Sequence, residues 1–224
     1  MSSLKRVGLI LVKNLIWVID ISMILAVSII QPAMLRPDNI IEIIYSVSMI
    51  GMLVLAEGIC LISGNFDLSV GAIAGLTAMI SASIMVYWCP GIPVWAAVFV
   101  TLLLGLFLGL INGVLVAKVV KNPFLVTLAT STVYTGIMTV VGRGKNIYGI
   151  PEGYLLIGAG EIVGIPMGVF ILAVTYFALD YIMRNSTLGR KIYAVGSNPI
   201  ASKEAGINVD RVLIYVFMLS GLLC

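Results

Sequence analysis

Residues 94–117 read VWAAVFVTLLLGLFLGLINGVLVA and contain no charged side chain. An α-helix rises about 1.5 Å per residue, so this stretch is long enough to cross the roughly 30 Å hydrocarbon core of a bilayer. The rest of the chain is similar, because 61% of its 224 residues are hydrophobic, 10% are charged and none is histidine. Soluble domains carry about 25% charged residues. The composition therefore excludes a soluble enzyme and predicts an all-α fold, a polytopic transmembrane helical bundle.

Seven apolar stretches are separated by polar breaks that contain Gly or Pro. We expect a single transmembrane domain over residues 1–224, with spans at 15–30, 40–63, 71–88, 94–117, 123–141, 166–183 and, as a partial span, 212–224. A helix over 212–224 is too short to cross the bilayer, and a natural end there would leave carbonyl groups unpaired in lipid. We therefore expect the sequence to be the front part of a longer protein.

Basic residues set the expected orientation. With the N-terminus in the cytoplasm, the outer segments hold Arg36, Arg143 and Lys145. The other ten of the 13 basic residues then lie inside: Lys5, Arg6, Lys13, Lys118, Lys121, Arg184, Arg190, Lys191, Lys203 and Arg211. Cytoplasmic loops of membrane proteins carry this excess of Lys and Arg. The sequence thus predicts a multi-pass membrane protein with a cytoplasmic N-terminus.

The sequence lacks the residues of several catalytic and cofactor sites. Without histidine it has no Ser-His-Asp triad and no histidine-ligated metal or haem. The run Gly142-Arg143-Gly144-Lys145 does not have the GxxxxGK[ST] spacing of a P-loop. We expect no catalytic residue, no metal and no cofactor in this chain.

Small residues recur at every fourth position in two of the expected spans. Gly105, Gly109 and Gly113 form a double GxxxG pattern, and Gly71 and Gly75 begin a similar line in 71–88. Such lines let helix backbones approach closely, because packing drives helix association in lipid. Close helix packing is the expected role, and a functional hinge is the alternative.

Hydroxyl side chains form one face of the expected helix 123–141. Thr127, Ser131, Thr135 and Thr139 recur every four residues and share one side of a helix. These hydroxyls either bond back to their own helix or to a neighbour, or part of the face lines a polar path for an uncharged, hydroxyl-bearing solute. In the second case the candidate path residues are Asn112, Thr127, Ser131 and Thr135.

Two carboxylates, Glu57 and Asp67, lie in apolar surroundings. A charge at the centre of a membrane helix costs about 2.5–3.5 kcal/mol on insertion scales, so each needs a partner or water. Asp67 stands just before the expected helix 71–88, where a carboxylate caps free amides. Asp67 is therefore expected to be a helix cap rather than an ion ligand, whereas Glu57 has no evident role.

The inner segment 184–211 contains a short helix signal. Asn198-Pro199 is a cap followed by proline, and Gly206 is a natural stop. The helix between them is too short to be stable alone. It is either a surface connection between spans or an element that docks on a partner.

Three segments resemble the permeases of bacterial ABC sugar importers of the ribose, xylose and galactoside type, within the family of binding-protein-dependent transport inner membrane components. Residues 63–71, SGNFDLSVG, resemble the SGGIDLSVG signature, with Asn65 and Phe66 as departures. Residues 122–128, NPFLVTL, look like the segment PPFIVTLG. Residues 188–198, LGRKIYAVGSN, and 205–209, AGINV, are similar to the loop FGRxxYAIGGN…SGINV. The signature residues are Gly64, Asn65, Asp67, Leu68, Ser69 and Gly71.

The resemblance implies a type II ABC importer-like permease of the inner membrane that moves a monosaccharide and performs no bond chemistry. Its partners would be a cytoplasmic ATPase that binds ATP, a second permease subunit and an extracytoplasmic solute-binding protein. Family members have about ten spans. The coupling helix that docks on the ATPase would comprise Pro199, Ile200, Ala201, Ser202, Lys203, Glu204, Ala205 and Gly206.

Two other functions remain open from the sequence. One is a permease of the same superfamily for a branched-chain amino acid, a nucleoside or an autoinducer. The other is a secondary transporter or channel that works without an ATPase, in which Glu57 is the proton site. The short inner helix favours the ATPase-linked alternatives, because a lone carrier needs no docking element.

Overall fold

The computed structural model describes residues 14–224. The chain consists of two compact units, Met1–Ser46 and Val47–Cys224. The described part of the first unit contains α2 (Leu15–Ile30), a 3₁₀ turn (Pro32–Leu35) and the beginning of α3 (Pro37–Ile62). Helix α3 continues into the second unit. The basic residues Lys5, Arg6 and Lys13, used for the expected orientation, lie outside the described residues.

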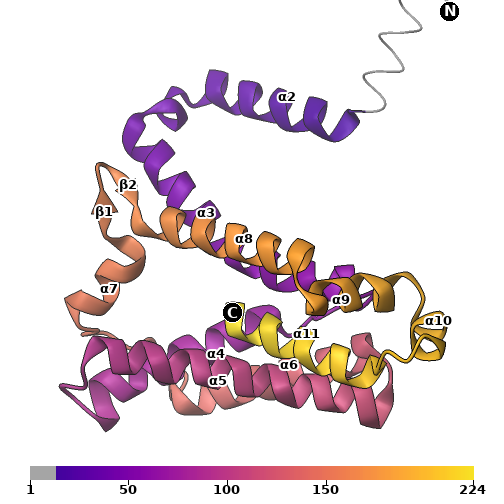
Figure 1. Cartoon of the computed structure of the whole chain (residues 1–224). Coiled ribbons are helices and arrows are strands. Elements are labelled where there is room, and N and C mark those ends of the chain that lie inside the picture. Colours follow the sequence, from indigo (N-terminus) through magenta and orange to yellow (C-terminus); the bar gives the residue numbers. More distant parts are fainter. Residues whose placement is uncertain (1–13) are drawn as a thin grey trace, which may run out of the picture. The chain divides into compact units, whose positions relative to one another are not determined.

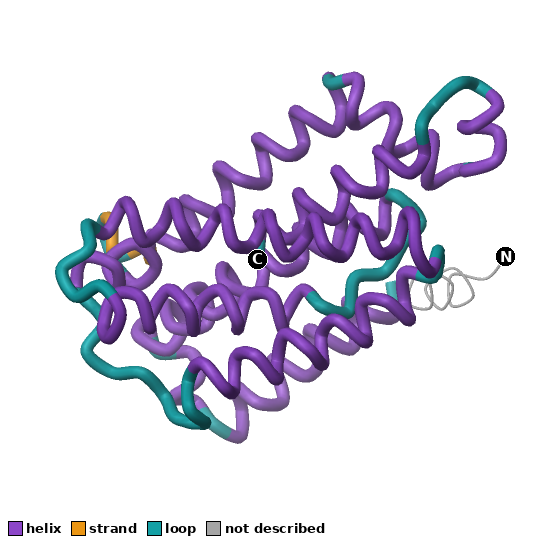
Figure 2. The backbone as a smooth tube through the Cα atoms, turned by 90° about the horizontal axis from the view of Figure 1, so that it is seen from below, coloured by secondary structure: helices purple, strands orange, loops and turns teal. Residues whose placement is uncertain are grey.

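The second unit is a helical bundle with one small hairpin (Figures 1 and 2). Its elements after α3 are α4 (Val70–Ser83), α5 (Val94–Val114), α6 (Pro123–Val141), α7 (Glu152–Ala159), β1 (Glu161–Ile162), β2 (Ile165–Pro166), α8 (Met167–Asn185), α9 (Thr187–Ser197), α10 (Pro199–Glu204) and α11 (Val209–Leu223). Helices α4 and α5 each end in a π-helical segment, Ile84–Trp88 and Leu115–Val120. Strands β1 and β2 are antiparallel. A polytopic helical fold is therefore confirmed.

Five helices within residues 14–224 are long and apolar enough to cross a membrane. They are Pro37–Ile62, Val70–Trp88, Val94–Val120, Pro123–Val141 and Met167–Asn185. The span predicted at 15–30 coincides with α2, an apolar helix of 16 residues that is shorter than these five and begins at the edge of the described residues. The loop expected at 142–165 contains α7 and the hairpin, and the loop expected at 184–211 is mostly helical, in α9 and α10.

The double GxxxG line packs against α11. A Cβ atom added at Gly105 or Gly109 would overlap the carbonyl oxygens of Gly221 and Phe217, and one added at Gly113 would lie 2.9 Å from Ile214 Cα. The two backbones are therefore in direct contact, and the packing role of the glycines is confirmed.

Helix α4 lies against both α5 and α6. Ile73 and Leu76 of α4, Leu108 of α5 and Tyr134 of α6 form one buried cluster. A Cβ atom at Gly75 would lie 2.9 Å from Sδ of the flexible Met138 side chain of α6, whereas a Cβ atom at Gly71 would meet no described atom within 4 Å. The non-helical segment at residues 63–69, between α3 and α4, is called the break. It lies close to α6 and α11.

Candidate functional site

The break between α3 and α4 begins with a regular helix stop. The Gly64 N–H donates to Leu61 O at 2.9 Å and the Asn65 N–H to Cys60 O at 2.9 Å, which is the bonding pattern of a Schellman motif. Gly64 has φ = 78°, in the left-handed region that favours glycine. The glycine of the SGNFDLSVG segment therefore turns the chain out of α3.

Groups from two helices accept the free amides of this break. The Asp67 N–H donates to Glu57 Oε2 at 3.1 Å, and the Leu68 N–H donates to Thr127 Oγ1 at 3.1 Å. Thr127 Oγ1 in turn donates to Pro123 O at 2.8 Å. Glu57 is a residue of α3 for which the sequence showed no evident role. Its side chain thus holds the backbone of the break.

Behind the break lies a buried chain of polar side chains. Asp67 Oδ1 accepts hydrogen bonds from the N–H and the hydroxyl of Ser69, and Asp67 Oδ2 accepts one from Ser220 Oγ at 3.2 Å. Asn112 Nδ2 donates to Ser69 Oγ at 2.6 Å, and the Tyr134 hydroxyl donates to Asn112 Oδ1 at 3.0 Å. We call these five residues the polar cluster. It joins the break to α5, α6 and α11.

The polar cluster is shielded from water and fully bonded. Asp67 is 3% exposed, Ser69, Asn112 and Ser220 are 0% exposed and Tyr134 is 4% exposed. In the part of the chain that the structure describes, every buried side-chain nitrogen or oxygen has a hydrogen-bond partner. Burial raises the pKa of the Asp67 carboxyl, and the hydrogen bonds from Ser69 and Ser220 partly oppose that rise. Such a network fixes one arrangement of the helices that contribute to it.

Asp67 differs from the expected helix cap. A cap would accept from the second or third amide of α4, whereas Asp67 accepts from the N–H of Ser69, the residue that precedes the helix. Its second oxygen bonds to α11 instead. Asp67 therefore ties the start of α4 to a distant helix.

The four candidate path residues separate into two pairs. Asn112 and Thr127 are 0% exposed and are bonded within the bundle. Ser131 and Thr135 lie on the accessible side of α6 and donate to Leu128 O and Ser131 O, each at 2.8 Å. These accessible hydroxyls bond back to their own helix as donors, and each oxygen still has acceptor capacity. The four do not line one surface in the described part of this chain.

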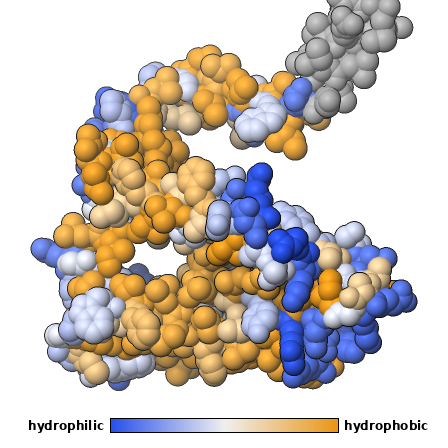
Figure 3. All heavy atoms as spheres, viewed as in Figure 1, coloured by the Kyte–Doolittle hydropathy of each residue, from blue (hydrophilic) through white to orange (hydrophobic). Residues whose placement is uncertain are grey.

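The short helix expected after Pro199 is present as α10. Asn198 Oδ1 accepts from the Ile200 and Ala201 amides at 3.0 Å each, Pro199 occupies the first turn and Gly206 has φ = 83°. Ile200 is 74% exposed on this helix. In Figure 3 hydrophilic residues gather at the end where α9 and α10 lie.

Helix α9 connects α10 to the break. A Cβ atom at Gly196, near the end of α9, would overlap the Ile62 carbonyl oxygen at the end of α3, and one at Gly64 would lie 3.5 Å from Gly196 O. Ile192 and Val195 of α9 are buried in one cluster with Ile59 of α3 and Val216 of α11. The backbone of α9 therefore contacts the backbone at the end of α3 and in the break.

One family model matches most of the chain. Residues 39–224 match the family model described as "Branched-chain amino acid transport system / permease component". The chain belongs to this family of permeases. The match covers α4 to α11 and nearly all of α3, which includes the break and α10.

The named relatives of the permease are sugar importers. It is 33% identical to the ribose import permease protein RbsC of Haemophilus influenzae, over 97% of this chain and 68% of that protein. It is 32% identical to the D-allose transport system permease protein AlsC of Escherichia coli, over 84% of this chain and 57% of the relative. The fructose import permease protein FrcC of Rhizobium meliloti is 32% identical, over 81% of this chain and 52% of its own length. No solved structure matches the chain.

The permease thus spans about half to two thirds of the length of these relatives. It is a multi-pass membrane protein, and its relatives are transport permeases rather than enzymes. Sequence reasoning missed Tyr134 and Ser220 as members of the polar cluster. The only sequence signal for either residue was a polar side chain in an apolar stretch, in α6 for Tyr134 and in α11 for Ser220.

Proposed function

We propose that this permease is the transmembrane subunit of an ATP-driven importer for a monosaccharide. The observation that carries the proposal is α10, a capped six-residue helix on the expected inner side with an exposed apolar residue, Ile200. A helix of this length is not stable alone, which favours an element that docks on a partner and offers Ile200 as a contact. The sugar relatives supply the substrate class.

The partners follow from the same proposal. A cytoplasmic ATPase binds ATP and receives the coupling helix Pro199–Gly206, an extracytoplasmic binding protein delivers the sugar, and a second permease copy completes the path. The permease itself binds no nucleotide and breaks no bond. Its N-terminus lies in the cytoplasm, as the distribution of Lys and Arg favours.

The accessible hydroxyl side of α6 is the candidate wall of the sugar path. Ser131 and Thr135 offer acceptor oxygens to sugar hydroxyl groups, and their own donors are already used within the helix. Asn112 and Thr127 support this wall from the buried side, because Asn112 accepts from Tyr134 and Thr127 accepts from the break. The carboxylate of Glu57 is engaged with the Asp67 amide, which disfavours the proton-driven alternative.

Motion would pass from the ATPase to this wall through contacts that the chain makes. ATP-driven movement of α10 displaces α9, and Gly196 of α9 presses on the end of α3. The break then shifts Asp67, whose bonds reach α11 through Ser220 and α5 and α6 through Ser69 and Asn112. The polar cluster thus converts movement of α10 into rearrangement of α5, α6 and α11.

Replacing Ile200 by aspartate is expected to reduce ATPase association at least tenfold, because a charge replaces the apolar side chain that docks. Affinity capture of the ATPase by the tagged permease measures this. Val163→Asp is the matched control, since Val163 is 96% exposed on the hairpin at the expected outer side. Unchanged capture with Ile200→Asp would contradict the coupling role of α10, as would equal losses in both variants.

A branched-chain amino acid is the second candidate solute, because the family description names it. Uptake of labelled ribose in the presence of excess leucine or excess allose separates the two. Competition by allose alone supports the sugar proposal, and competition by leucine alone supports the second candidate.

A further inference from the structure

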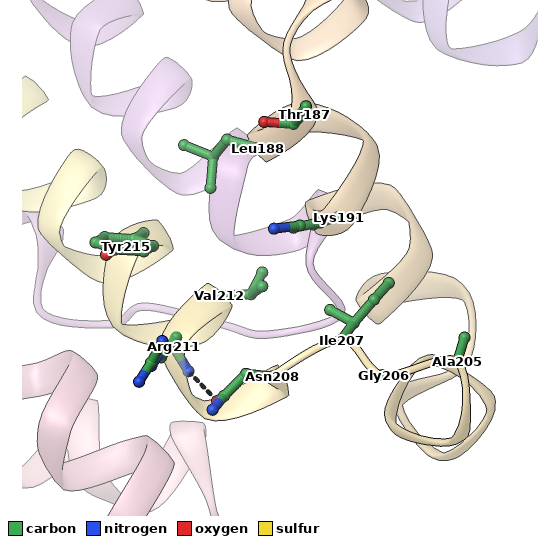
Figure 4. A pocket seen from close by; sticks show the side chains of 10 residues that line it. All are labelled: Thr187, Leu188, Lys191, Ala205, Gly206, Ile207, Asn208, Arg211, Val212 and Tyr215. Carbon is green, nitrogen blue, oxygen red and sulfur yellow. Dashed lines mark hydrogen bonds between the residues drawn. The ribbon is translucent and has the colours of Figure 1, made fainter.

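A pocket of about 710 Å³ lies between α9 and α11, apart from the polar cluster and from α6 (Figure 4). Ten residues line it: Thr187, Leu188, Lys191, Ala205, Gly206, Ile207, Asn208, Arg211, Val212 and Tyr215. Figure 4 shows Leu188 and Lys191 pointing from α9 into the space before α11, with Tyr215 on the opposite side. Ala205 and Gly206 at its edge belong to the proposed coupling helix, whereas its other lining residues have no part in the proposed transport mechanism.

The lining has the chemistry of an anion site. It contains two cations, Lys191 and Arg211, and among the described residues no carboxylate lines it. Thr187 and Asn208 add a hydroxyl and an amide, although Asn208 Oδ1 already accepts from the Arg211 N–H at 3.0 Å. Lysine, arginine and hydroxyl donors together suit phosphate oxygens.

The pocket also has an apolar side, which a free anion would not need. Leu188, Ile207 and Val212 contribute to its wall, and Tyr215 is 50% exposed there. Tyrosine is enriched at the level of lipid headgroups, where its ring meets apolar chains and its hydroxyl meets water. The lining therefore fits a molecule with a charged head and an apolar part.

The position along the chain agrees with headgroup depth. Helix α8, one of the five membrane-crossing helices, ends at Asn185, and Thr187 begins α9 two residues later. Arg211 is in the first turn of the apolar helix α11. The cations thus stand where two apolar helices meet the inner surface, the side on which a basic pocket attracts anionic lipid.

We propose that this pocket binds the phosphate headgroup of an anionic phospholipid of the inner leaflet. Lys191 and Arg211 hold the phosphate, and acyl chains follow the apolar wall beside Tyr215. The bound lipid links α9 to α11, and it thereby fixes the base from which α10 projects. The proposal rests on the inner-side orientation given above, and it does not depend on which solute is carried.

The test measures lipid bound to the purified full chain in nanodiscs, without sugar or ATPase. The nanodiscs contain phosphatidylcholine with about 10% phosphatidylglycerol as the anionic lipid. Native mass spectrometry counts the lipid that the protein retains. The double variant Lys191→Ala, Arg211→Ala is expected to lower phosphatidylglycerol retention roughly thirtyfold, because each surface cation contributes to anionic-lipid attraction.

The matched control is the double variant Arg190→Ala, Lys203→Ala, which removes the same charge from the same inner segment but does not line the pocket. It should retain the lipid, and so should Lys191→Arg, Arg211→Lys, which keeps both charges and shows that the pocket is intact. Equal loss in the control would overturn the proposal in favour of diffuse surface attraction.

Two further arms identify the source of the phosphate. Inorganic phosphate at millimolar concentration should not displace the lipid, because it cannot fill the apolar wall. Displacement by phosphate, or equal retention of phosphatidylcholine, would overturn the proposal.

The second arm measures chemical acetylation of Lys191. If the ATPase protects Lys191 from the reagent and phosphatidylglycerol does not, the pocket belongs to a protein partner and the proposal is overturned. A failed lipid result leaves sugar uptake intact, so the two proposals fail separately.

Discussion

Gly109→Ala is expected to destabilise the bundle by about 2–3 kcal/mol, the upper range for overpacking of a closely packed contact. The added methyl group would overlap the carbonyl oxygen of Phe217 and lie 3.1 Å from Gly221 Cα, so backbone and not a flexible side chain must move. Separation of α5 from α11 also strains the hydrogen bonds that link Asn112 to Ser220 through Ser69 and Asp67. The thermal unfolding midpoint in detergent measures the loss.

Gly136→Ala is the matched control for this prediction. It makes the same change in a helix, but the new methyl group meets no described atom within 4 Å. Alanine is favoured over glycine in a helix by about 0.5–1 kcal/mol, so the control should unfold at the same or a higher temperature. Equal midpoints for the two variants would show that α5 and α11 do not touch through Gly109.

Asp67→Ala is expected to abolish solute uptake while leaving membrane insertion and ATPase capture intact. It removes the acceptor for the Ser69 amide and for the hydroxyls of Ser69 and Ser220. Each buried donor left without a partner costs about 1–3 kcal/mol. The start of α4 then loses its link to α11, so movement of α10 no longer reaches the helices around the polar cluster.

Asp180→Ala is the control for this loss. Asp180 is also an acid, but it is paired with Arg184 on the exposed side of α8, at 2.7 Å. An exposed pair of this kind contributes little to stability, so uptake should stay near that of the unchanged chain. Retained uptake in Asp67→Ala would refute a transmitting role for the polar cluster, and loss of ATPase capture would point to misfolding instead.

The sequence analysis predicted the membrane helices and their caps because these depend on local chemistry. Uncharged stretches mark the spans, Asn198 caps the helix that follows it, and Gly206 ends α10. The GxxxG line predicted a close contact, yet only the structure supplied the partner, α11. A periodic pattern identifies which face of a helix packs but contains nothing about which other helix it meets.

The polar cluster could not be predicted because its bonds join distant residues. Asp67 and Ser220 are 153 positions apart, and Asn112 is 43 positions from Ser69. The bond to Ser220 also explains why Asp67 is no simple cap. The 15–30 stretch was predicted from its apolar run, and α2 has the same bounds, with Gln31 and Pro32 directly after it.

ATP-dependent uptake of a labelled monosaccharide is the most direct test of the central claim. Cells that express the permease with its ATPase and binding protein are compared with cells in which only the ATPase gene is deleted. The account predicts that uptake falls to background without the ATPase and that Ile200→Asp reproduces this loss. Uptake that continues without the ATPase, driven by a proton gradient, would contradict an ATP-driven permease.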